Sequence, residues 1–334
     1  MSEKTVILGL ETSCDETAAA VVVNGREVLS NVIASQVAEH RVYGGVVPEI
    51  AARKHVECIS YIVDEALRQA GLTLDDIHGV AVSNCPGLVG ALLVGLSYAK
   101  ALAFARQVPL IGVHHIYSHI CANYLNEGPA WEPPFICLVV AGGHTHLLEV
   151  SGYHNCRILG RTRDDAAGEA FDKVGRTLGL PYPGGPEIDR LAKEGDSNAV
   201  AFPRAIFPDS LDFSFSGLKS AVLQYLRKNK CVVSADVAAS FQQAVVDVLV
   251  SNTIEACKRS NLAKVALAGG VAANDSLRTA MVRVSEEYGL ALHLPQKVYC
   301  TDNAAMVASG GYYRYKTGKI DSLDLNAYPN MDIE

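Results

Sequence analysis

Long apolar segments are missing from this chain of 334 residues. No run of about 18 or more apolar residues appears, which is the length that a membrane-spanning helix needs. The first residues, MSEKTVILGLETS, lack the basic start and the small-residue cleavage site of a secretory signal. These two absences predict a cytoplasmic protein that does not span a membrane.

Closely spaced cysteines are also missing. The nine cysteines are odd in number and scattered, and none forms a C-x-x-C pair. A disulfide framework or a zinc knuckle would need such regular spacing. We therefore expect reduced and mostly buried thiols.

An excess of positive charge is absent as well, because the net charge is −7. This excludes a protein that binds nucleic acid over its whole surface, but it allows a local basic groove or a partner that supplies one. Apolar residues make up 49% of the chain, enough for two domains or for one large two-lobed unit.

Strands and helices alternate through the first third of the chain. A buried-type strand at 5–10 leads into the polar turn ETSCDET, and two further strands are joined by Asn24-Gly25, a strong hairpin signal. A helix is predicted from Pro48 to Ala70, with Gly71 at its end. A strand, a long apolar helix and another strand follow, so we expect an α/β sheet covered on both faces.

The opening pattern returns roughly 130 residues later, a distance near the usual size of one domain. After a Gly/Pro-rich segment at 126–134, residues 135–161 again read as strand, loop, strand, turn and strand. We expect two related lobes, 1–130 and 131–334, whose polar loops ETSCDET and AGGHTH face each other across a cleft. The second lobe should carry an inserted helical segment, a helix at about 234–260 and a last helix with Asp302 near its start.

Two histidines lie four residues apart in the segment IGVHHIYSHICA. If the chain is helical there, His115 and His119 share one face and can hold a metal ion from a rigid backbone. The alternative is an ordinary helix with two polar residues on its exposed side. The Glu of the H-E-x-x-H motif is absent, which disfavours a metallopeptidase.

Asp302 has two interpretations. It can be a third, oxygen ligand beside the two histidines, leaving open positions for water or substrate. It can equally be the N-cap of the last helix, because Asp at a helix start accepts backbone N–H bonds.

Three turns rich in glycine or hydroxyl groups follow strands, at 11–17, 141–145 and 268–274. Backbone N–H groups in such turns can bind phosphate oxygens. No turn matches the P-loop or the G-x-G-x-x-G pattern. Together they favour a nucleotide cleft between the lobes. The segment FSFSGLK at 213–219 is either a loop that closes over substrate or an edge strand that packs two Phe rings.

Many of these motifs together resemble one family. They are GLETSCDETAAAV, PEIAARKH, PGLVGALLVGLSYAKALA, HHIYSH, AGGHTHL, DDAAGEAFDKVGRTLGLPYPGGPEID, FSFSGLKSAV, LAGGVAANDSLR and TDNAAMVA. In this order, from Val6 to about Gly311, they resemble the TsaD family in its bacterial or organellar form. The resemblance implies an actin/Hsp70-like (ASKHA) fold built from two RNase H-like units.

The resemblance also implies an activity. The family transfers a threonylcarbamoyl group from threonylcarbamoyl-AMP to the N6 amine of the adenosine 3′ to the anticodon, in tRNAs that read codons beginning with A, and releases AMP. A nucleotide-binding ATPase or scaffold of the same fold, without transfer, is the alternative.

Site residues follow from the same resemblance. It implies a divalent ion, Fe²⁺ or Zn²⁺, on His115, His119 and Asp302, and it makes Glu11, Asp15 and Glu16 the candidate catalytic acids. Threonylcarbamoyl-AMP or ATP/ADP is expected on Val139, Val140, Ala141, Gly142, Gly143, Asp172, Gly185, Asp189 and Asn274. The expected partners are tRNA and TsaB-like and TsaE-like proteins, or a second copy in a homodimer.

Overall fold

The computed structural model describes residues 4–125, 130–229 and 231–333. The chain forms two compact units: unit 1 comprises Met1–Glu132 and Asp302–Glu334, and unit 2 comprises Pro133–Thr301. The expected boundary after residue 130 lies two residues from the observed one. Residues 302–334 differ from the expectation, because they belong to unit 1 and not to the second lobe. Residues 126–129 of the predicted Gly/Pro-rich segment lie outside the described residues.

Unit 1 contains a five-stranded sheet in the order β3-β2-β1-β4-β5. Its elements are β1 (Val6–Glu11), β2 (Glu16–Val23), β3 (Glu27–Ser35), α1 (Val37–Arg41), α2 (Pro48–Ala70), β4 (Gly79–Cys85), α3 (Val89–Arg106), β5 (Leu110–His114), α4 (His115–Cys121), η1 (Ala122–Tyr124) and α10 (Ala304–Lys316).

The predicted local signals shape unit 1. Asn24 and Gly25 both have positive φ, 53° and 71°, as the tight turn between β2 and β3 requires. Helix α2 begins at Pro48 and ends at Ala70, and Gly71 closes it in the left-handed conformation. The antiparallel pairs β1–β2 and β2–β3 and the parallel pairs β1–β4 and β4–β5 confirm the predicted α/β arrangement.

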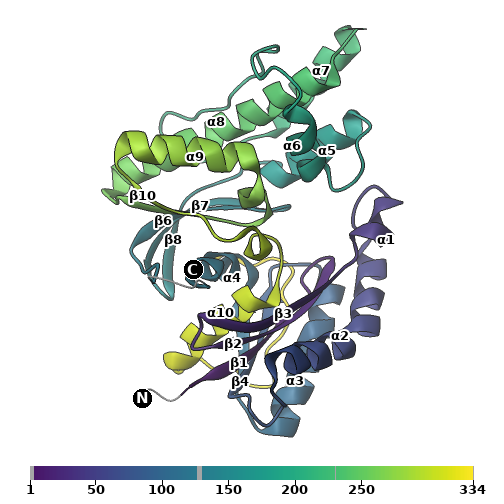
Figure 1. Ribbon diagram of the computed structural model, residues 1–334, viewed down its shortest axis with the longest axis vertical. Coiled ribbons are helices and arrows are strands. Elements are labelled where there is room, and N and C mark those ends of the chain that lie inside the picture. Colours follow the sequence, from purple (N-terminus) through teal and green to yellow (C-terminus); the bar gives the residue numbers. More distant parts are fainter. Residues whose placement is uncertain (1–3, 126–129, 230, 334) are drawn as a thin grey trace. The chain divides into compact units, whose positions relative to one another are not determined.

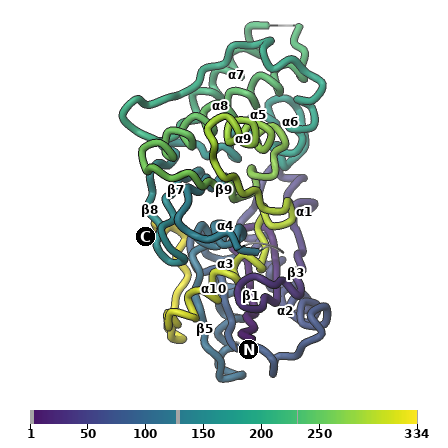
Figure 2. Tube along the Cα trace, turned by 60° about the vertical axis from the view of Figure 1, so that its left-hand side comes forward, coloured from purple at the N-terminus to yellow at the C-terminus, as the bar shows by residue number. Residues whose placement is uncertain are grey.

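Helices cover both faces of strand β1. Leu8 and Leu10 point into the core that contains residues of α2 and α3, such as Val63 and Leu92. Gly9 points the other way, because successive residues of a strand alternate in direction. A Cβ atom at Gly9 would collide with the Ala304 carbonyl of α10, so the missing side chain lets α10 lie directly on the strand. In both views α10, drawn in yellow, lies beside β1 (Figures 1 and 2).

Helix α3 has the length and the mean hydropathy, 1.3, of a possible membrane span. It packs on β4 and α2 and contributes Leu92, Leu96 and Ala99 to the core of unit 1. A single helix of this kind is weak evidence for a membrane span, because core helices can have the same length and hydropathy.

Unit 2 repeats the sheet of unit 1. Its strand order is β8-β7-β6-β9-β10, which matches β3-β2-β1-β4-β5 strand for strand. The elements are β6 (Phe135–Val140), β7 (Thr145–Gly152), β8 (Asn155–Arg161), α5 (Ala167–Thr177), α6 (Gly184–Ala192), α7 (Ser216–Lys228), α8 (Ser234–Ser260), β9 (Lys264–Ala268), η2 (Gly270–Ala273), α9 (Asp275–Tyr288), β10 (Ala291–His293) and η3 (Lys297–Tyr299). The repeated pattern in the sequence is therefore a repeated topology.

Three helices of unit 2, α5, α6 and α7, lie between β8 and α8, in the lobe for which the sequence predicts an inserted helical segment. The segment FSFSGLK is not an edge strand, since only Phe213 forms an isolated bridge, to Thr162, and α7 begins at Ser216. The two Phe rings do pack, because Phe213 and Phe215 are buried and stacked with centroids 6.2 Å apart. These helices are stabilised by core packing, which local helix propensity does not report.

Candidate metal centre and nucleotide site

The end of β5 runs directly into α4, and both predicted histidine ligands lie on that helix. All seven residues of α4 are buried, and the rings of His115 and His119 approach to 4.7 Å between centroids. His114 is the N-cap, and its side chain accepts a hydrogen bond from the Ile116 N–H. The one-turn spacing therefore places the two imidazoles together on a buried face of the helix.

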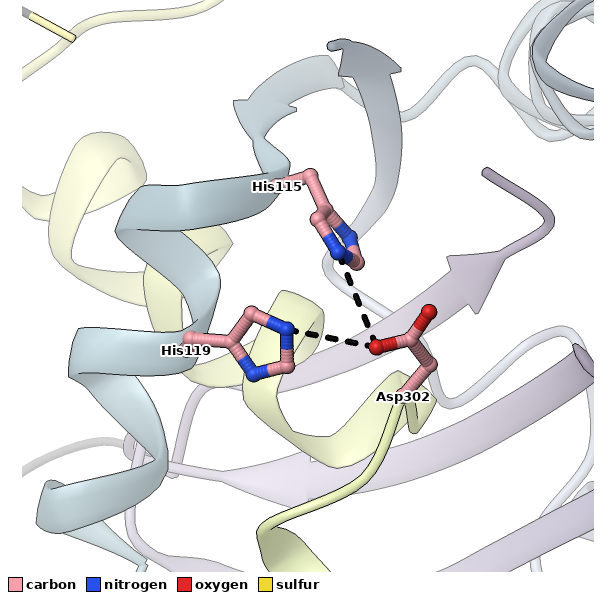
Figure 3. A group of neighbouring side chains, drawn as sticks. All are labelled: His115, His119 and Asp302. Carbon is pink, nitrogen blue, oxygen red and sulfur yellow. Dashed lines mark ion pairs between the residues drawn. The ribbon is translucent and has the colours of Figure 1, made fainter. Parts of the chain in front are cut away.

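Asp302 completes the group. Its Oδ1 atom lies 3.2 Å from His119 Nε2 and 3.6 Å from His115 Nε2 (Figure 3). The N-cap interpretation of Asp302 is wrong: Asn303 is the N-cap of α10, and its side chain accepts from the Met306 N–H at 3.0 Å. Asn303 leaves the carboxylate of Asp302 available to the histidines.

The geometry of these three side chains fits a divalent metal ion. One ligand atom from each lies within 4.8 Å of the others. His119 is fully buried, yet neither of its ring nitrogens has a hydrogen-bond partner among the described residues. A buried imidazole without hydrogen bonds is costly unless a ligand satisfies it. Two imidazoles and one carboxylate with open positions suit Fe²⁺ or Zn²⁺.

Glu11, at the end of β1, lies on the Nδ1 side of the His115 ring. Its Oε2 atom is 3.0 Å from His115 Nδ1 and accepts a hydrogen bond from the Ser83 hydroxyl at 2.5 Å. Its Oε1 atom accepts from the Ser13 N–H, and the side chain is fully buried. A proton on Nδ1 therefore faces Glu11, and the Nε2 atom faces Asp302.

Electrostatics in this region depend on burial and on close charges. Burial opposes protonation of His115, but the Asp302 and Glu11 carboxylates together raise its pKa to about 9. Burial would raise the pKa of Glu11, yet the charge and hydrogen bond of His115 hold it below its usual value. The ring is thus held between two carboxylates.

Asp15 and Glu16 lie next to this group at the start of β2. Asp15 is buried, and Glu16 accepts a hydrogen bond from the Ser35 hydroxyl at 3.0 Å. Burial, followed by the charges of Asp15 and Asp302, raises the pKa of Glu16 to about 10. The structure therefore brings all three predicted acids and all three predicted ligands to one end of the unit 1 sheet.

In unit 2 the predicted nucleotide residues gather around the end of β6. Val139 and Val140 are buried in the strand, and the Ala141 N–H donates to the His144 carbonyl at 2.8 Å to form a tight turn. Gly142 and Gly143 are exposed, with open space where a side chain would be. Their backbone can thus approach a ligand closely.

Two further glycines, which the motifs do not mark as site residues, pack closely against this turn. A Cβ atom at Gly168 on α5 would lie 2.5 Å from the Ala141 carbonyl oxygen, and one at Gly269 would lie 2.5 Å from that of Val140. Gly269 follows strand β9, and Gly168 lies at the start of α5. Both belong to glycine-containing motifs in the sequence, but the sequence does not indicate what each glycine packs against.

The remaining predicted residues lie on α5, α6 and the start of α9. Asp172 Oδ1 accepts a hydrogen bond from the Gly184 N–H at 2.7 Å. Gly184 is the first residue of α6 and Gly185 the second, so Asp172 contacts the start of this helix. Asp189 Oδ2 accepts from the Asp275 N–H, while its buried Oδ1 has no partner among the described residues.

Asn274 is the N-cap of α9. Its side chain accepts from the Leu277 N–H at 2.9 Å and donates to Gln242 Oε1 at 2.7 Å. Gln242 was not selected from the sequence, because its position on α8 carries no motif.

Solved structures of known proteins share this fold. T. kodakarensis HypF matches with a TM-score of 0.64 and 17% identity, over 96% of this chain and 49% of that chain. An activator of the 2-hydroxyisocaproyl-CoA dehydratase from Clostridium difficile with bound ADPNP matches with a TM-score of 0.51 and 14% identity, over 94% and 97%. Two related sheets of this topology define the class of actin/Hsp70-like (ASKHA) proteins.

Sequence relatives give the family within this class. The family model for TsaD, tRNA N6-adenosine threonylcarbamoyltransferase, matches residues 27–309. Curated proteins of that name are 58% identical in Clostridium botulinum (strain 657 / Type Ba4), over 100% of this chain and 99% of the relative, and 57% identical in Clostridium perfringens (strain ATCC 13124), over 99% of each. The chain belongs to the TsaD family.

The predicted activity is therefore confirmed, and the alternative of a scaffold without transfer is not supported. The enzyme transfers the threonylcarbamoyl group of threonylcarbamoyl-AMP to N6 of the adenosine beside the anticodon, and tRNA is its substrate.

Proposed function

We propose that the transferase holds one divalent ion, Fe²⁺ or Zn²⁺, on His115, His119 and Asp302. The observation that carries this proposal is the convergence of three ligand atoms within 4.8 Å around a buried imidazole without hydrogen bonds. When bound there, such an ion supplies Lewis-acid polarisation of the carbamoyl carbonyl and neutralises charge at the mixed anhydride.

Glu11 positions one of these ligands. By accepting the Nδ1 proton of His115, it fixes the tautomer whose Nε2 atom can bind the ion. We therefore assign Glu11 to orientation of His115, and we assign the proton transfer of the reaction to its neighbours.

Asp15 and Glu16 are the candidate proton acceptors. In the reaction the exocyclic amine nitrogen bonds to the carbamoyl carbon, the bond from that carbon to the phosphate oxygen breaks, and AMP leaves with the electron pair. The amine must lose one proton. Asp15 accepts it in our proposal, while Glu16, whose pKa burial raises to about 10, is the protonated member of the pair.

The nucleotide part of the substrate binds to unit 2 in this proposal. The exposed backbone of Gly142 and Gly143 and the unpartnered Oδ1 atom of Asp189 support it, since they offer donors to a phosphate and an acceptor to a hydroxyl group. The activator with bound ADPNP shows that a protein of this fold binds an adenine nucleotide. The proposed site for threonylcarbamoyl-AMP or ATP/ADP also includes the remaining predicted residues, which are Val139, Val140, Ala141, Asp172, Gly185 and Asn274.

Protein partners complete the proposal. A net charge of −7 repels the tRNA backbone, so contact with tRNA requires a local basic groove or a surface that partners supply. We propose cytoplasmic assemblies with TsaB-like and TsaE-like proteins, or a homodimer. Incubation with threonylcarbamoyl-AMP, ATP, tRNA and these partners should give threonylcarbamoyladenosine in the tRNA digest only when the required partner is present.

The metal proposal is tested with the double variant His115→Ala/His119→Ala. We expect it to fold with a wild-type circular dichroism spectrum, to contain no stoichiometric metal by mass spectrometry, and to lose transfer. His114→Asn is the matched control, because Asn retains the N-cap acceptor and His114 is not a ligand. A double variant that transfers at the wild-type rate without metal contradicts the proposal.

A further inference from the structure

Two histidines of unit 1 outside the ligand set are fully buried, His40 on α1 and His55 on α2. The side chain of Gln36 lies between them. Its Oε1 atom is 3.1 Å from His40 Nε2, and its Nε2 atom is 3.3 Å from His55 Nδ1. We call these three side chains the His40–Gln36–His55 relay. His55 ends the motif PEIAARKH, to which neither the metal centre nor the nucleotide site assigns a role.

Two backbone groups fix the direction of the hydrogen bonds in the relay. At one end the Val47 N–H donates to His40 Nδ1 at 3.3 Å, and at the other end His55 Nε2 lies 3.0 Å from the Cys14 carbonyl oxygen. An N–H can only donate and a carbonyl can only accept. His40 therefore donates from Nε2 to Gln36, whose amide donates to His55, and His55 donates from Nε2 to Cys14.

Both imidazoles are consequently neutral, with the proton on Nε2. The Thr17 hydroxyl, 2.8 Å from His55 Nδ1, fits the same tautomer as a second donor to that nitrogen. Burial lowers the pKa of His55, although its bond to Cys14 acts in the opposite direction, which agrees with a neutral ring.

The relay ends at the backbone beside Asp15. His55 holds the carbonyl of Cys14, and the backbone N–H of Gln36 donates to the carbonyl of Asp15 at 3.0 Å. These carbonyls belong to the two peptide groups that flank the Asp15 Cα atom. Because each peptide group is planar, fixing both of them fixes φ and ψ of Asp15 and therefore the direction of its Cα–Cβ bond, from which the carboxylate extends.

We propose that His55 is a positioning residue of the transferase, which aims the carboxylate of Asp15 through the Cys14 carbonyl. His40 and Gln36 keep His55 in the tautomer that can donate to this carbonyl. The inference rests on the proposed role of Asp15 as proton acceptor. Misplacing a reacting group by about 1 Å costs roughly 100-fold in rate, so the fixed backbone has a direct kinetic consequence.

Two substitutions at His55 separate donation from packing. In His55→Gln the amide Nε2 can still donate to the Cys14 carbonyl, whereas His55→Leu fills a similar volume without a donor. We expect His55→Leu to lower kcat about 100-fold with KM for threonylcarbamoyl-AMP within about twofold, and His55→Gln to regain most of this loss. Both variants should retain one equivalent of metal, because His55 is not a ligand.

A double-mutant cycle with Asp15→Asn distinguishes positioning from general destabilisation. If His55 acts through Asp15, adding His55→Leu to Asp15→Asn produces no further loss, whereas an independent structural effect multiplies the two losses. Wild-type kcat in His55→Leu, or independent losses in the cycle, overturns the inference. Full activity in Asp15→Asn instead overturns the proposed role of Asp15.

NMR of ¹⁵N-labelled imidazoles tests the relay in the wild-type protein and does not depend on whether a variant folds. We expect both His40 and His55 to show the Nε2–H tautomer, and His55, whose pKa burial lowers, to stay neutral between about pH 6 and 8, where an ordinary histidine titrates. A neutral His55 ring with its proton on Nδ1 cannot donate from Nε2 to Cys14, and this result overturns the inference.

Discussion

Glu11 and Asp302 lie on opposite edges of the His115 ring, with Glu11 Oε2 3.0 Å from Nδ1 and Asp302 Oδ1 3.6 Å from Nε2. Both carboxylates attract the same imidazole, but they do so through different atoms. Only the Nε2 side faces His119 and the proposed ion. The two acids should therefore differ in what their removal does to metal binding.

Glu11→Gln should weaken metal binding by about 10- to 100-fold, the usual effect of losing a carboxylate that orients a histidine ligand. The Gln carbonyl can still accept the Nδ1 proton, so the protein should stay folded. Competition with a chelator measures the affinity, and the exposed Glu57→Gln on α2 is the control. Unchanged affinity in Glu11→Gln would show that Glu11 does not orient His115.

Gly9→Ala should destabilise unit 1 by about 1–3 kcal/mol, because the new methyl group has no room against α10. Asp302 lies two residues before α10, next to its N-cap Asn303, so displacement of the helix should also reduce metal content. Gly90→Ala on α3 is the matched control, since its Cβ would meet only Ala52, at 3.4 Å. Urea unfolding and metal analysis measure the two effects. Equal behaviour of the two variants would contradict the close approach of α10.

Asn274→Ala should cost about 1 kcal/mol for the lost N-cap of α9, and more because buried Gln242 loses its partner. Asn274→Ser keeps a cap acceptor and isolates the loss of the Gln242 contact. Thermal unfolding measures stability, and calorimetric titration with AMP or ADP measures nucleotide binding. We expect weaker binding in both variants; wild-type affinity in both would remove Asn274 from the proposed site.

Cysteine reactivity should follow burial. All nine cysteines are free and six are buried, as the sequence predicts. Burial raises the pKa of Cys85, Cys156 and Cys257 to about 11, so at pH 8 only about one in a thousand of each is a thiolate.

Alkylation of the native protein with iodoacetamide at pH 8 should therefore modify exposed Cys231 well before these three. Their rates should rise as pH increases toward 11, because the thiolate is the reactive form. Peptide mass spectrometry measures each site, and urea-unfolded protein is the control. Equal rates at Cys231 and Cys257 in the native protein would contradict the burial of Cys257.

The sequence predicted those parts of the molecule that local patterns determine. The hairpin at Asn24-Gly25, the bounds of α2 and the His115/His119 pair all follow from residue spacing and turn chemistry. The sequence left the N-cap of α10 undecided, and the neighbouring Asn303 takes it. The approach of Asp302 to His115 and His119 depends on contact between segments that are distant in the sequence.

Contacts between distant segments account for what the sequence did not predict. Glu11 was recognised as an acid, but its place behind His115 results from the pairing of β1 with β4 and of β4 with β5. Helices α5 to α7 contain glycines that lower local helix propensity, and packing of residues such as Phe171 and Val222 in the core of unit 2 compensates. The return of the chain to unit 1 at residues 302–334 could not be predicted, because no local sequence pattern indicates it.

That return has a consequence for biosynthesis. The histidine ligands are translated early, whereas Asp302 is made only after all of unit 2, which is one continuous segment from Pro133 to Thr301. A nascent chain that already contains β5 and α4 still lacks the carboxylate and the helix that covers β1. The proposed metal can therefore bind all three side chains only at a late step, after the ribosome has finished the second unit.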